Sequence, residues 1–268
     1  MSSALRTLVV LAVAAAACAA FRVVGDALNL PWSDDWTEAA LKVAFWVAPC
    51  AIALRLWGMR RYGDVAQALG LTRVVARGYG FGLAASLPMI AALPFAGSLH
   101  PVPLSVLVST IVVGPFAEEV LFRGWVFRQL WRRAGWPPAA ALVVSAMAFG
   151  VAHLANPVTF LTNPYLTVRD LTFVFNAVGA GALFAWIVWR RDSLWPAIGL
   201  HTCLNLSWQL MGNVGFAASR GHVYDPTVPN AVRVASIGLA VVLTLMSPQR
   251  VRRAAKEDDA PGATLEDA

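Results

Sequence analysis

Ionisable and amide side chains occur inside long apolar stretches of this sequence, where their cost makes each one a functional candidate. The set consists of Glu118, Glu119, Arg123, His153, His201 and Asn205. Residues four apart share a helix face, so Glu119 can pair with Arg123, and His201 can point the same way as Asn205. A lone polar residue is often a strut between helices. Six such residues on three segments indicate a reactive site instead.

The chemistry that these residue types offer is hydrolysis. A buried glutamate can act as a general base on a water molecule that attacks a peptide carbonyl. A nearby histidine could orient that water or protonate the leaving amine, and the N–H groups of Asn205 suit an oxyanion. Alternatively, Glu118, His153 and His201 could bind a divalent metal such as zinc, which would itself activate water. We expect no cofactor, and the residues alone leave the metal alternative open.

The segments that must position these residues are predicted to be membrane helices. Of the 268 residues, 58% are hydrophobic and 13% are charged, whereas soluble domains carry about 25% charged residues. A bilayer core needs about 20 apolar residues per helix. About eight such stretches occur, near residues 7–24, 39–59, 78–99, 102–126, 137–155, 171–189, 194–212 and 231–247. The predicted fold is an all-α, polytopic integral membrane protein.

The distribution of basic residues predicts that both termini are cytoplasmic. In that layout every inner segment carries arginine, as cytoplasmic loops do, and the acidic cluster Asp34, Asp35 and Glu38 falls outside. Lys42 also falls on the outer side, at the start of the second span, where it can snorkel to the surface. The first span resembles a signal peptide in composition, but we interpret it as a retained anchor because the other spans insert the chain anyway.

Depth in the bilayer brings the polar residues together. With a rise of about 1.5 Å per helical residue, Glu118 and His201 each lie roughly 15 Å from the basic residues of the nearest inner loop. On the same rise, His153 lies about 24 Å from the inner end of its span. Three separate spans therefore carry polar residues near or just beyond the midplane, as one shared site requires.

Three motifs resemble those of a known family. Glu-Glu-x-x-x-Arg at residues 118–123, Phe-x-x-x-His at 149–153 and His-x-x-x-Asn at 201–205 follow one another along the chain. Their types, order and spacing resemble the CPBP group of intramembrane proteases, also called Abi-type. This group includes the type II CAAX prenyl endopeptidases (CAAX prenyl protease 2) and bacterial relatives similar to lysostaphin resistance protein A. The likeness covers about residues 114–212.

The resemblance implies an intramembrane endopeptidase with a glutamate-dependent mechanism and no catalytic metal. Eukaryotic members cleave prenylated proteins. This chain looks bacterial, because it is rich in alanine and arginine and nearly free of lysine, so we expect a membrane-associated protein or peptide as substrate. The implied roles are water activation for Glu118 and His153, support of the site for Glu119 and Arg123, and oxyanion stabilisation for His201 and Asn205.

Three parts of the chain are distinguished by composition and motifs. Residues 1–100 form N-terminal transmembrane helices of unassigned role, residues 101–247 a protease-like core, and residues 248–268 a charged tail expected to be disordered. The expected location is the bacterial inner membrane, as a multi-pass protein whose partners are the lipid bilayer and the substrate. Nucleic acid is not expected, because the basic residues form short clusters rather than one face with interleaved aromatics.

One competing function uses the same buried residues. Carboxylates and histidines near the midplane also suit proton relays, so a non-proteolytic membrane protein is the alternative. It would be a proton-coupled transporter or an immunity or binding scaffold. The sequence shows no internal repeat of the kind that many transporters carry. This absence and the oxyanion-type Asn205 favour the protease.

Overall fold

The computed structural model describes residues 2–27, 35–71, 75–92, 103–153, 168–210 and 227–247. All regular secondary structure within these ranges is helical, which confirms the predicted fold class. In chain order the segments are α1 (Ser3–Ala27), α2 (Asp35–Lys42), η1 (Val43–Val47), α3 (Ala48–Leu56), α4 (Tyr62–Leu69), α5 (Val75–Ala85), α6 (Leu87–Ala92), α7 (Leu104–Val106), η3 (Leu107–Val113), α8 (Gly114–Glu119), η4 (Val120–Phe127), α9 (Arg128–Arg132), α10 (Pro138–Ala152), α12 (Val168–Arg191), α13 (Trp195–Leu210) and α15 (Thr227–Met246). The η segments are π-helical. The predicted tail lies outside the described residues.

Each predicted span coincides with helix in the described ranges, with differences in detail. The third one consists of two helices, α5 and α6, that meet at Ser86. The short helix α4 lies between predicted spans and was not expected from hydropathy. Among the described residues, three helical stretches are long and apolar enough to cross a membrane, namely Ser3–Gly25, Trp36–Leu56 and Leu104–Arg132. Pro138–Ala152 and Arg233–Met246 are apolar but shorter.

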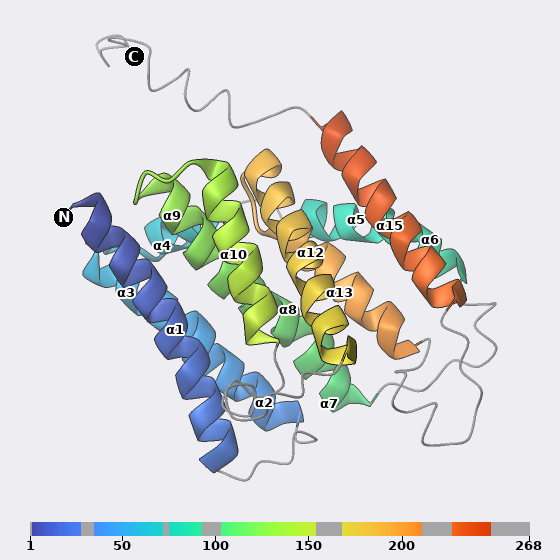
Figure 1. The fold of residues 1–268 in the computed structure, drawn as a ribbon, viewed down its shortest axis with the longest axis horizontal. Coiled ribbons are helices and arrows are strands. Elements are labelled where there is room, and N and C mark those ends of the chain that lie inside the picture. Colours follow the sequence, from blue (N-terminus) through green and yellow to red (C-terminus); the bar gives the residue numbers. More distant parts are fainter. Residues whose placement is uncertain are drawn as a thin grey trace.

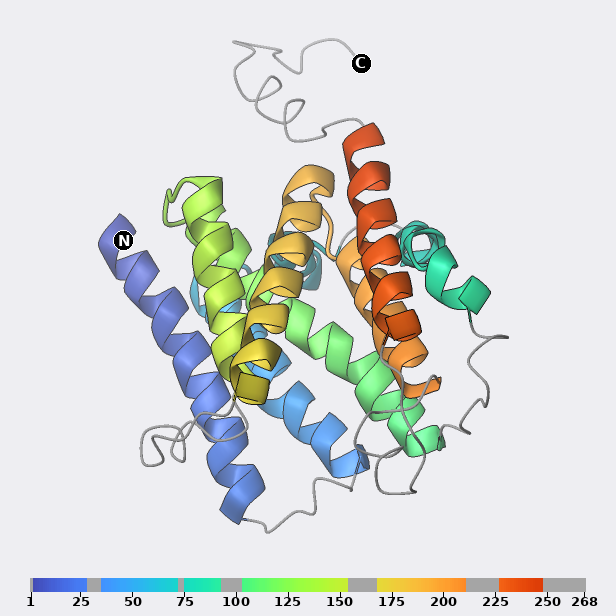
Figure 2. The same ribbon diagram turned by 45° about the vertical axis from the view of Figure 1, so that its right-hand side comes forward.

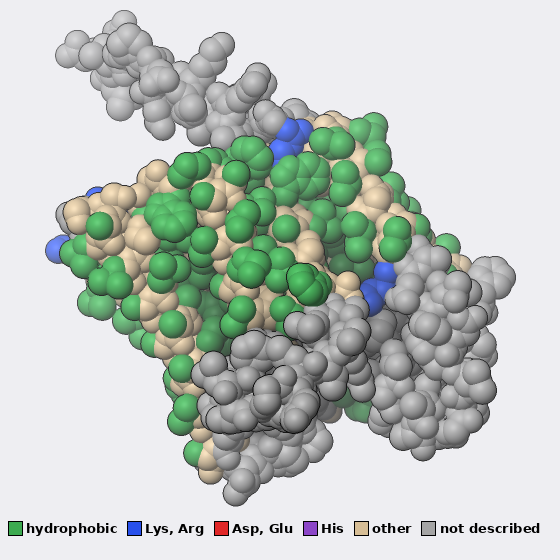
Figure 3. Space-filling model, in the orientation of Figure 1, with side chains coloured by type: hydrophobic (Ala, Val, Ile, Leu, Met, Phe, Trp, Pro, Cys, Tyr) green, Lys and Arg blue, Asp and Glu red, His purple; other side chains and the backbone are tan. Residues whose placement is uncertain are grey.

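Large apolar side chains cover much of the outer surface. Leu8 is 63% exposed, Phe175 72% and Met246 77%. Hydrophobic side chains also dominate the described part of the face seen in Figure 3. Soluble proteins expose only small apolar patches, because apolar surface is unfavourable in contact with water. A surface as apolar as this one is typical of a protein that contacts lipid. The chain is therefore a polytopic membrane protein, and the count of eight spans and the cytoplasmic termini stay predictions.

The helix from α7 to α9 lies at the centre of the bundle. It runs obliquely behind α10 and α12 in Figure 2 and contacts α1, α10, α12 and α13. Every residue from 117 to 130 is buried. A helix that is apolar on all sides belongs inside a bundle. The four charged residues of this stretch, Glu118, Glu119, Arg123 and Arg128, are therefore buried by the other helices.

Glycines set the packing of α13, which carries His201, against α5. A Cβ atom on Gly82 would lie 2.2 Å from the carbonyl carbon of Gly199, and one on Gly78 would lie 2.2 Å from the Cβ of Trp195. Small residues four apart let two membrane helices approach backbone to backbone. Figure 1 shows α5 beside the upper part of α13, and the two helices are in contact. Their close approach fixes the position of α13, which carries His201 two residues beyond Gly199.

Replacing Gly82 by alanine tests this contact, with Gly80 as the matched control on the same helix. A Cβ on Gly80 would meet nothing within 4 Å. We expect Gly82→Ala to lower the free energy of unfolding by about 1–3 kcal/mol through overpacking. Gly80→Ala should leave it unchanged or raise it by up to about 1 kcal/mol. Thermal unfolding in detergent measures both, and equal behaviour of the two variants would contradict the close approach.

Candidate active site

Three helices bring Glu118 together with both histidines. Glu118 lies near the end of α8, His153 follows α10, and His201 is on α13. The Oε2 atom of Glu118 is 3.9 Å from Nε2 of His153 and 3.7 Å from Nε2 of His201. These separations are too long for direct hydrogen bonds. They are short enough for one water molecule to bridge the carboxylate to either imidazole.

His153 lies just after the C-terminal end of α10. The predicted span, residues 137–155, had placed it inside the helix. The helix ends at Ala152, and the His153 backbone N–H bonds to the carbonyls of the last turn. Its Nδ1 lies 2.8 Å from the carbonyl oxygen of Phe149. Because a carbonyl only accepts, Nδ1 carries the hydrogen, and Nε2 is the atom that faces Glu118. Phe149, the first residue of the Phe-x-x-x-His motif, also packs its ring 4.3 Å from that of His153.

A buried chain of three side chains orients His201. The Oε1 atom of Glu119 lies 3.0 Å from Nδ1 of His201 and accepts a second hydrogen bond of 3.0 Å from Arg123. The pairing of Glu119 with Arg123 predicted from their spacing is therefore present. Since an ionised carboxylate only accepts, Nδ1 of His201 donates and its Nε2 faces Glu118. Both imidazoles thus present the same ring nitrogen to one carboxylate oxygen.

The Arg123 guanidinium lies between aromatic rings. Its Cζ atom is 4.2 Å from the ring centroid of Phe149 and 5.2 Å from that of Phe184, which in turn stacks on His201 at 5.0 Å. The Nε and Nη2 atoms of Arg123 have no hydrogen-bond partner among the described residues. Burying a pair that is only partly hydrogen-bonded is costly. We infer that the pair is kept for geometry rather than for stability.

Gly181 on α12 provides the room for Arg123, and motif analysis missed it. A Cβ atom there would lie 3.3 Å from Nη2 of Arg123 and 3.1 Å from Cα of Ala146 on α10. Because Gly181 has no side chain, the Arg123 guanidinium has room beside α12. The one signal in the sequence is a glycine three residues before the aromatic Phe184, and this pattern is too common to single out.

Lys42 contributes a cation to the site from outside the motifs. The sequence predicts that it snorkels to the outer surface, whereas the structure directs its Nζ to Oε1 of Glu118 at 3.2 Å and Oε1 of Glu38 at 2.9 Å. Its side chain is 11% exposed. The two oxygens of Glu118 therefore have different partners, Lys42 on one side and the imidazoles on the other. The sequence offered one indication of this role: Lys42 lies within a predicted span and follows Glu38 by four residues.

Asn205 bonds to a backbone carbonyl that lacks its usual donor because residue 115 is proline. In the π-helical segment η3, the Gly114 N–H bonds to the carbonyl five residues back, that of Ser109. The next donor in this register would be residue 115, but proline has no N–H. The Thr110 carbonyl that it would have met instead accepts a hydrogen bond of 3.0 Å from Nδ2 of Asn205. One N–H of the Asn205 amide is thus used to tie α13 to η3, and a second N–H remains for other contacts.

A three-residue metal site is not formed by the described residues. Glu118, His153 and His201 converge, but no group of three His, Cys, Asp or Glu side chains has the arrangement that holds a metal ion. Lys42 also places a positive charge 3.2 Å from the shared carboxylate. That charge would repel a divalent cation at Glu118. The residues present do not fit a metal in this geometry.

Comparison with known proteins assigns the part of the chain that carries these motifs. Residues 100–207 match the family model described as "Type II CAAX prenyl endopeptidase Rce1-like". We call residues 100–207 the Rce1-like segment, because they are similar to that family. All six residues identified from the motifs lie within the Rce1-like segment, and Lys42 lies outside it.

A curated relative extends the comparison. The chain is 28% identical over 107 residues to a Bacillus subtilis (strain 168) protein named "Putative membrane peptidase YdiL". The aligned region is 40% of this chain and 36% of that protein, so the chain spans little more than a third of the relative's length. No solved structure matches the chain.

Replacing Asn205 tests its structural bond within the Rce1-like segment. Asn205→Leu leaves the Thr110 carbonyl without a donor and should cost about 1 kcal/mol of unfolding free energy. Adding Pro115→Ala supplies a backbone N–H for that carbonyl, so the double variant should be more stable than the sum of the single effects predicts. Asn176→Leu, at an exposed position on α12, is the control and should cost little. Strict additivity of the two changes would rule out the shared carbonyl.

Proposed function

We propose that this chain is an intramembrane endopeptidase that hydrolyses a peptide bond of a membrane-associated protein or peptide. The observation that carries the proposal is the convergence of Glu118 Oε2 with Nε2 of His153 and of His201. The match of residues 100–207 to the Rce1-like family model supports the same activity. The name of the Bacillus subtilis relative is also that of a peptidase.

Glu118 and His153 are proposed to activate the attacking water. A water molecule between Glu118 Oε2 and His153 Nε2 can donate one hydrogen to each, which directs an oxygen lone pair toward the substrate carbonyl. The carboxylate takes a proton as the new C–O bond forms. The protonated Glu118, or His153 after proton transfer, then donates that proton to the leaving nitrogen as the C–N bond breaks.

His201 and Asn205 are proposed to stabilise the oxyanion. Nδ1 of His201 already donates to Glu119, so His201 can donate from Nε2 only when both ring nitrogens are protonated. The Glu119 carboxylate stabilises such an imidazolium, as the aspartate of a catalytic triad does. The second N–H of Asn205 supplies another donor. The His201 imidazolium and the Asn205 amide would then supply two donors to the developing oxyanion.

Lys42 is proposed as a positioning residue for a mechanism that does not need a metal. Its ammonium group holds Oε1 of Glu118, so that Oε2 is directed at the imidazoles. It also favours the ionised carboxylate, which is the form that accepts a proton. The substrate stays defined by class alone. The name of the matching family refers to prenylated substrates. Nothing in the described residues of this chain favours binding of a prenyl group.

Substitution of Glu118 tests the activity. We expect Glu118→Gln to reduce cleavage by about 10²–10⁴-fold, the usual contribution of general base catalysis, without loss of insertion or folding. Comparing protein termini in membranes that carry the native chain or Glu118→Gln would reveal the substrate. Asn176→Ala is the control and should retain cleavage. New termini that persist in Glu118→Gln, or substrate flux in liposomes without any cleavage, would refute the proposal.

Lys42 provides a second test. Lys42→Met leaves Glu118 without its charged partner and should lower kcat roughly tenfold to a hundredfold, as loss of a hydrogen bond between charged groups does. Lys42→Arg should restore most of the activity, because the cation is kept. Glu38→Gln should have a smaller effect than Lys42→Met, since the pair with Glu118 persists. A Lys42→Met enzyme with native kcat would show that the cation does not position Glu118.

A further inference from the structure

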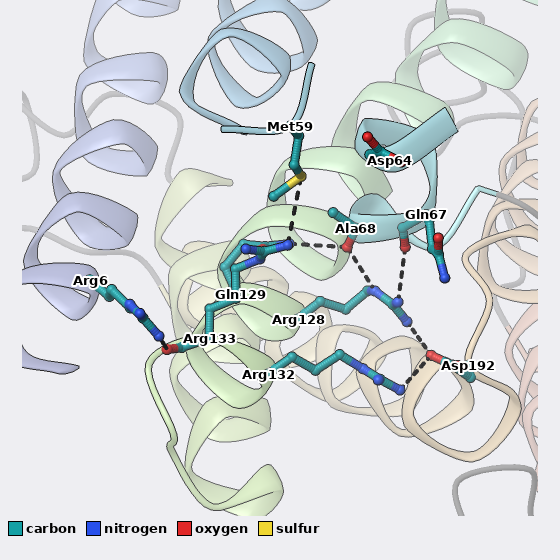
Figure 4. A pocket seen from close by; sticks show the side chains of 10 residues that line it. All are labelled: Arg6, Met59, Asp64, Gln67, Ala68, Arg128, Gln129, Arg132, Arg133 and Asp192. Carbon is teal, nitrogen blue, oxygen red and sulfur yellow. Dashed lines mark hydrogen bonds and ion pairs between the residues drawn. The ribbon is translucent and has the colours of Figure 1, made fainter. Parts of the chain in front are cut away.

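A polar cavity of about 520 Å³, away from the candidate active site, lies at the arginine-rich end of the bundle. Figure 4 shows side chains that enter it from the start of α1, from α4, from α9 and from the turn after α12. Its charged lining residues are Arg6, Asp64, Arg128, Arg132, Arg133 and Asp192. These segments are among those that the sequence predicts at the inner membrane surface. None of the six residues belongs to the candidate active site.

Tryptophans close to residues that line the cavity indicate its depth. The Trp136 indole donates a hydrogen bond of 3.0 Å to Thr7, the residue after Arg6. The Arg132 guanidinium lies 4.4 Å from the ring centroid of Trp131. Tryptophan concentrates at the level of lipid headgroups, where its ring is half wet. The cavity therefore opens at the interface rather than in the hydrocarbon core.

The carboxylates of the cavity already have partners. Asp192 accepts from Arg128 at 2.5 Å and from Arg132 at 2.9 Å (Figure 4). The Nε and Nη2 atoms of Arg128 donate to the carbonyls of Ala68 and Gln67. Asp64 accepts from the backbone N–H of Arg61 at the start of α4. Four arginines against two aspartates leave the lining with an excess of positive charge.

Arg6 and Arg133 carry that excess. Among the described residues neither has a carboxylate partner: Arg6 donates to the Arg133 carbonyl at 2.8 Å, and Arg133 reaches only the weak acceptor Sδ of Met59 at 3.6 Å. Burial, and then the charge of Arg6, lower the pKa of Arg133. Two neighbouring cations that lack a carboxylate partner repel each other. A bound anion would relieve this repulsion.

We propose that this cavity binds a phosphate group between Arg6 and Arg133. Guanidinium N–H groups match the oxygens of phosphate in geometry and charge. The phosphate can belong to an anionic phospholipid headgroup or be free in solution. A basic cavity between helices at the inner surface is the usual setting for the lipid. Bound there, the anion would link the start of α1 to the end of α9.

Native mass spectrometry of the full chain in detergent tests the proposal with dioleoylphosphatidylglycerol as the probe. We expect Arg6→Gln/Arg133→Gln to weaken retention of this lipid by about 30-fold, at roughly 1 kcal/mol per arginine. Arg60→Gln/Arg61→Gln is the matched control. It removes the same charge from two exposed residues near the same end that do not line the cavity, and it should change retention little.

Further arms distinguish the sources of the phosphate. Arg6→Lys/Arg133→Lys should retain much of the binding, which separates lost charge from misfolding. If dioleoylphosphatidylglycerol is retained and 10 mM inorganic phosphate does not displace it, the lipid is the ligand. If inorganic phosphate displaces the lipid and raises the melting temperature of the native chain but not of the glutamine variant, free phosphate is the ligand. Equal loss in the control, or equal retention of dioleoylphosphatidylcholine, would overturn the proposal.

Discussion

The buried ion pair between Glu119 and Arg123 is the interaction on which the rest of the site depends. Neither residue is exposed at all, and charges in such a position are tolerated only with partners. Arg123 needs the space at Gly181 and the rings of Phe149 and Phe184. Glu119 in turn fixes which nitrogen of His201 carries a hydrogen. One pair thereby links the central helix to α10, α12 and α13.

A missing backbone donor has a comparable effect on the other side of the site. Pro115 interrupts the hydrogen bonding of η3 one residue after Gly114 and makes the Thr110 carbonyl available to Asn205. The same arrangement recurs at η1, where Ala48 bonds to the carbonyl of Val43 and Pro49 follows. π-helical turns are rare and occur often at functional sites. At η3 the carbonyl left by the π-helical turn is met by a side chain from another helix.

Hydropathy and spacing predicted those features that depend on neighbours in the sequence. The helical fold follows from apolar stretches of bilayer length, and the contact of Glu119 with Arg123 follows from their separation by four residues. The similar depths calculated for Glu118 and His201 in their spans predicted that the two residues lie near each other, and in the structure they are 3.7 Å apart. Lys42 was misplaced, because its direction depends on how the second helix crosses the central one. Gly181 and the Thr110 carbonyl depend on packing and on helical register, about which residue types say nothing.

The ion pair of Lys42 with Glu118 crosses the boundary of the matched family segment, which begins at residue 100. Inside that segment, Glu118, Glu119 and Arg123 together bear one uncompensated negative charge. Lys42 balances it, while Glu38 lies nearer the surface with its side chain 24% exposed. The charged cluster around Glu118 is therefore assembled from both parts of the chain. The segment that matches the family model does not by itself supply every charged partner of its own Glu118.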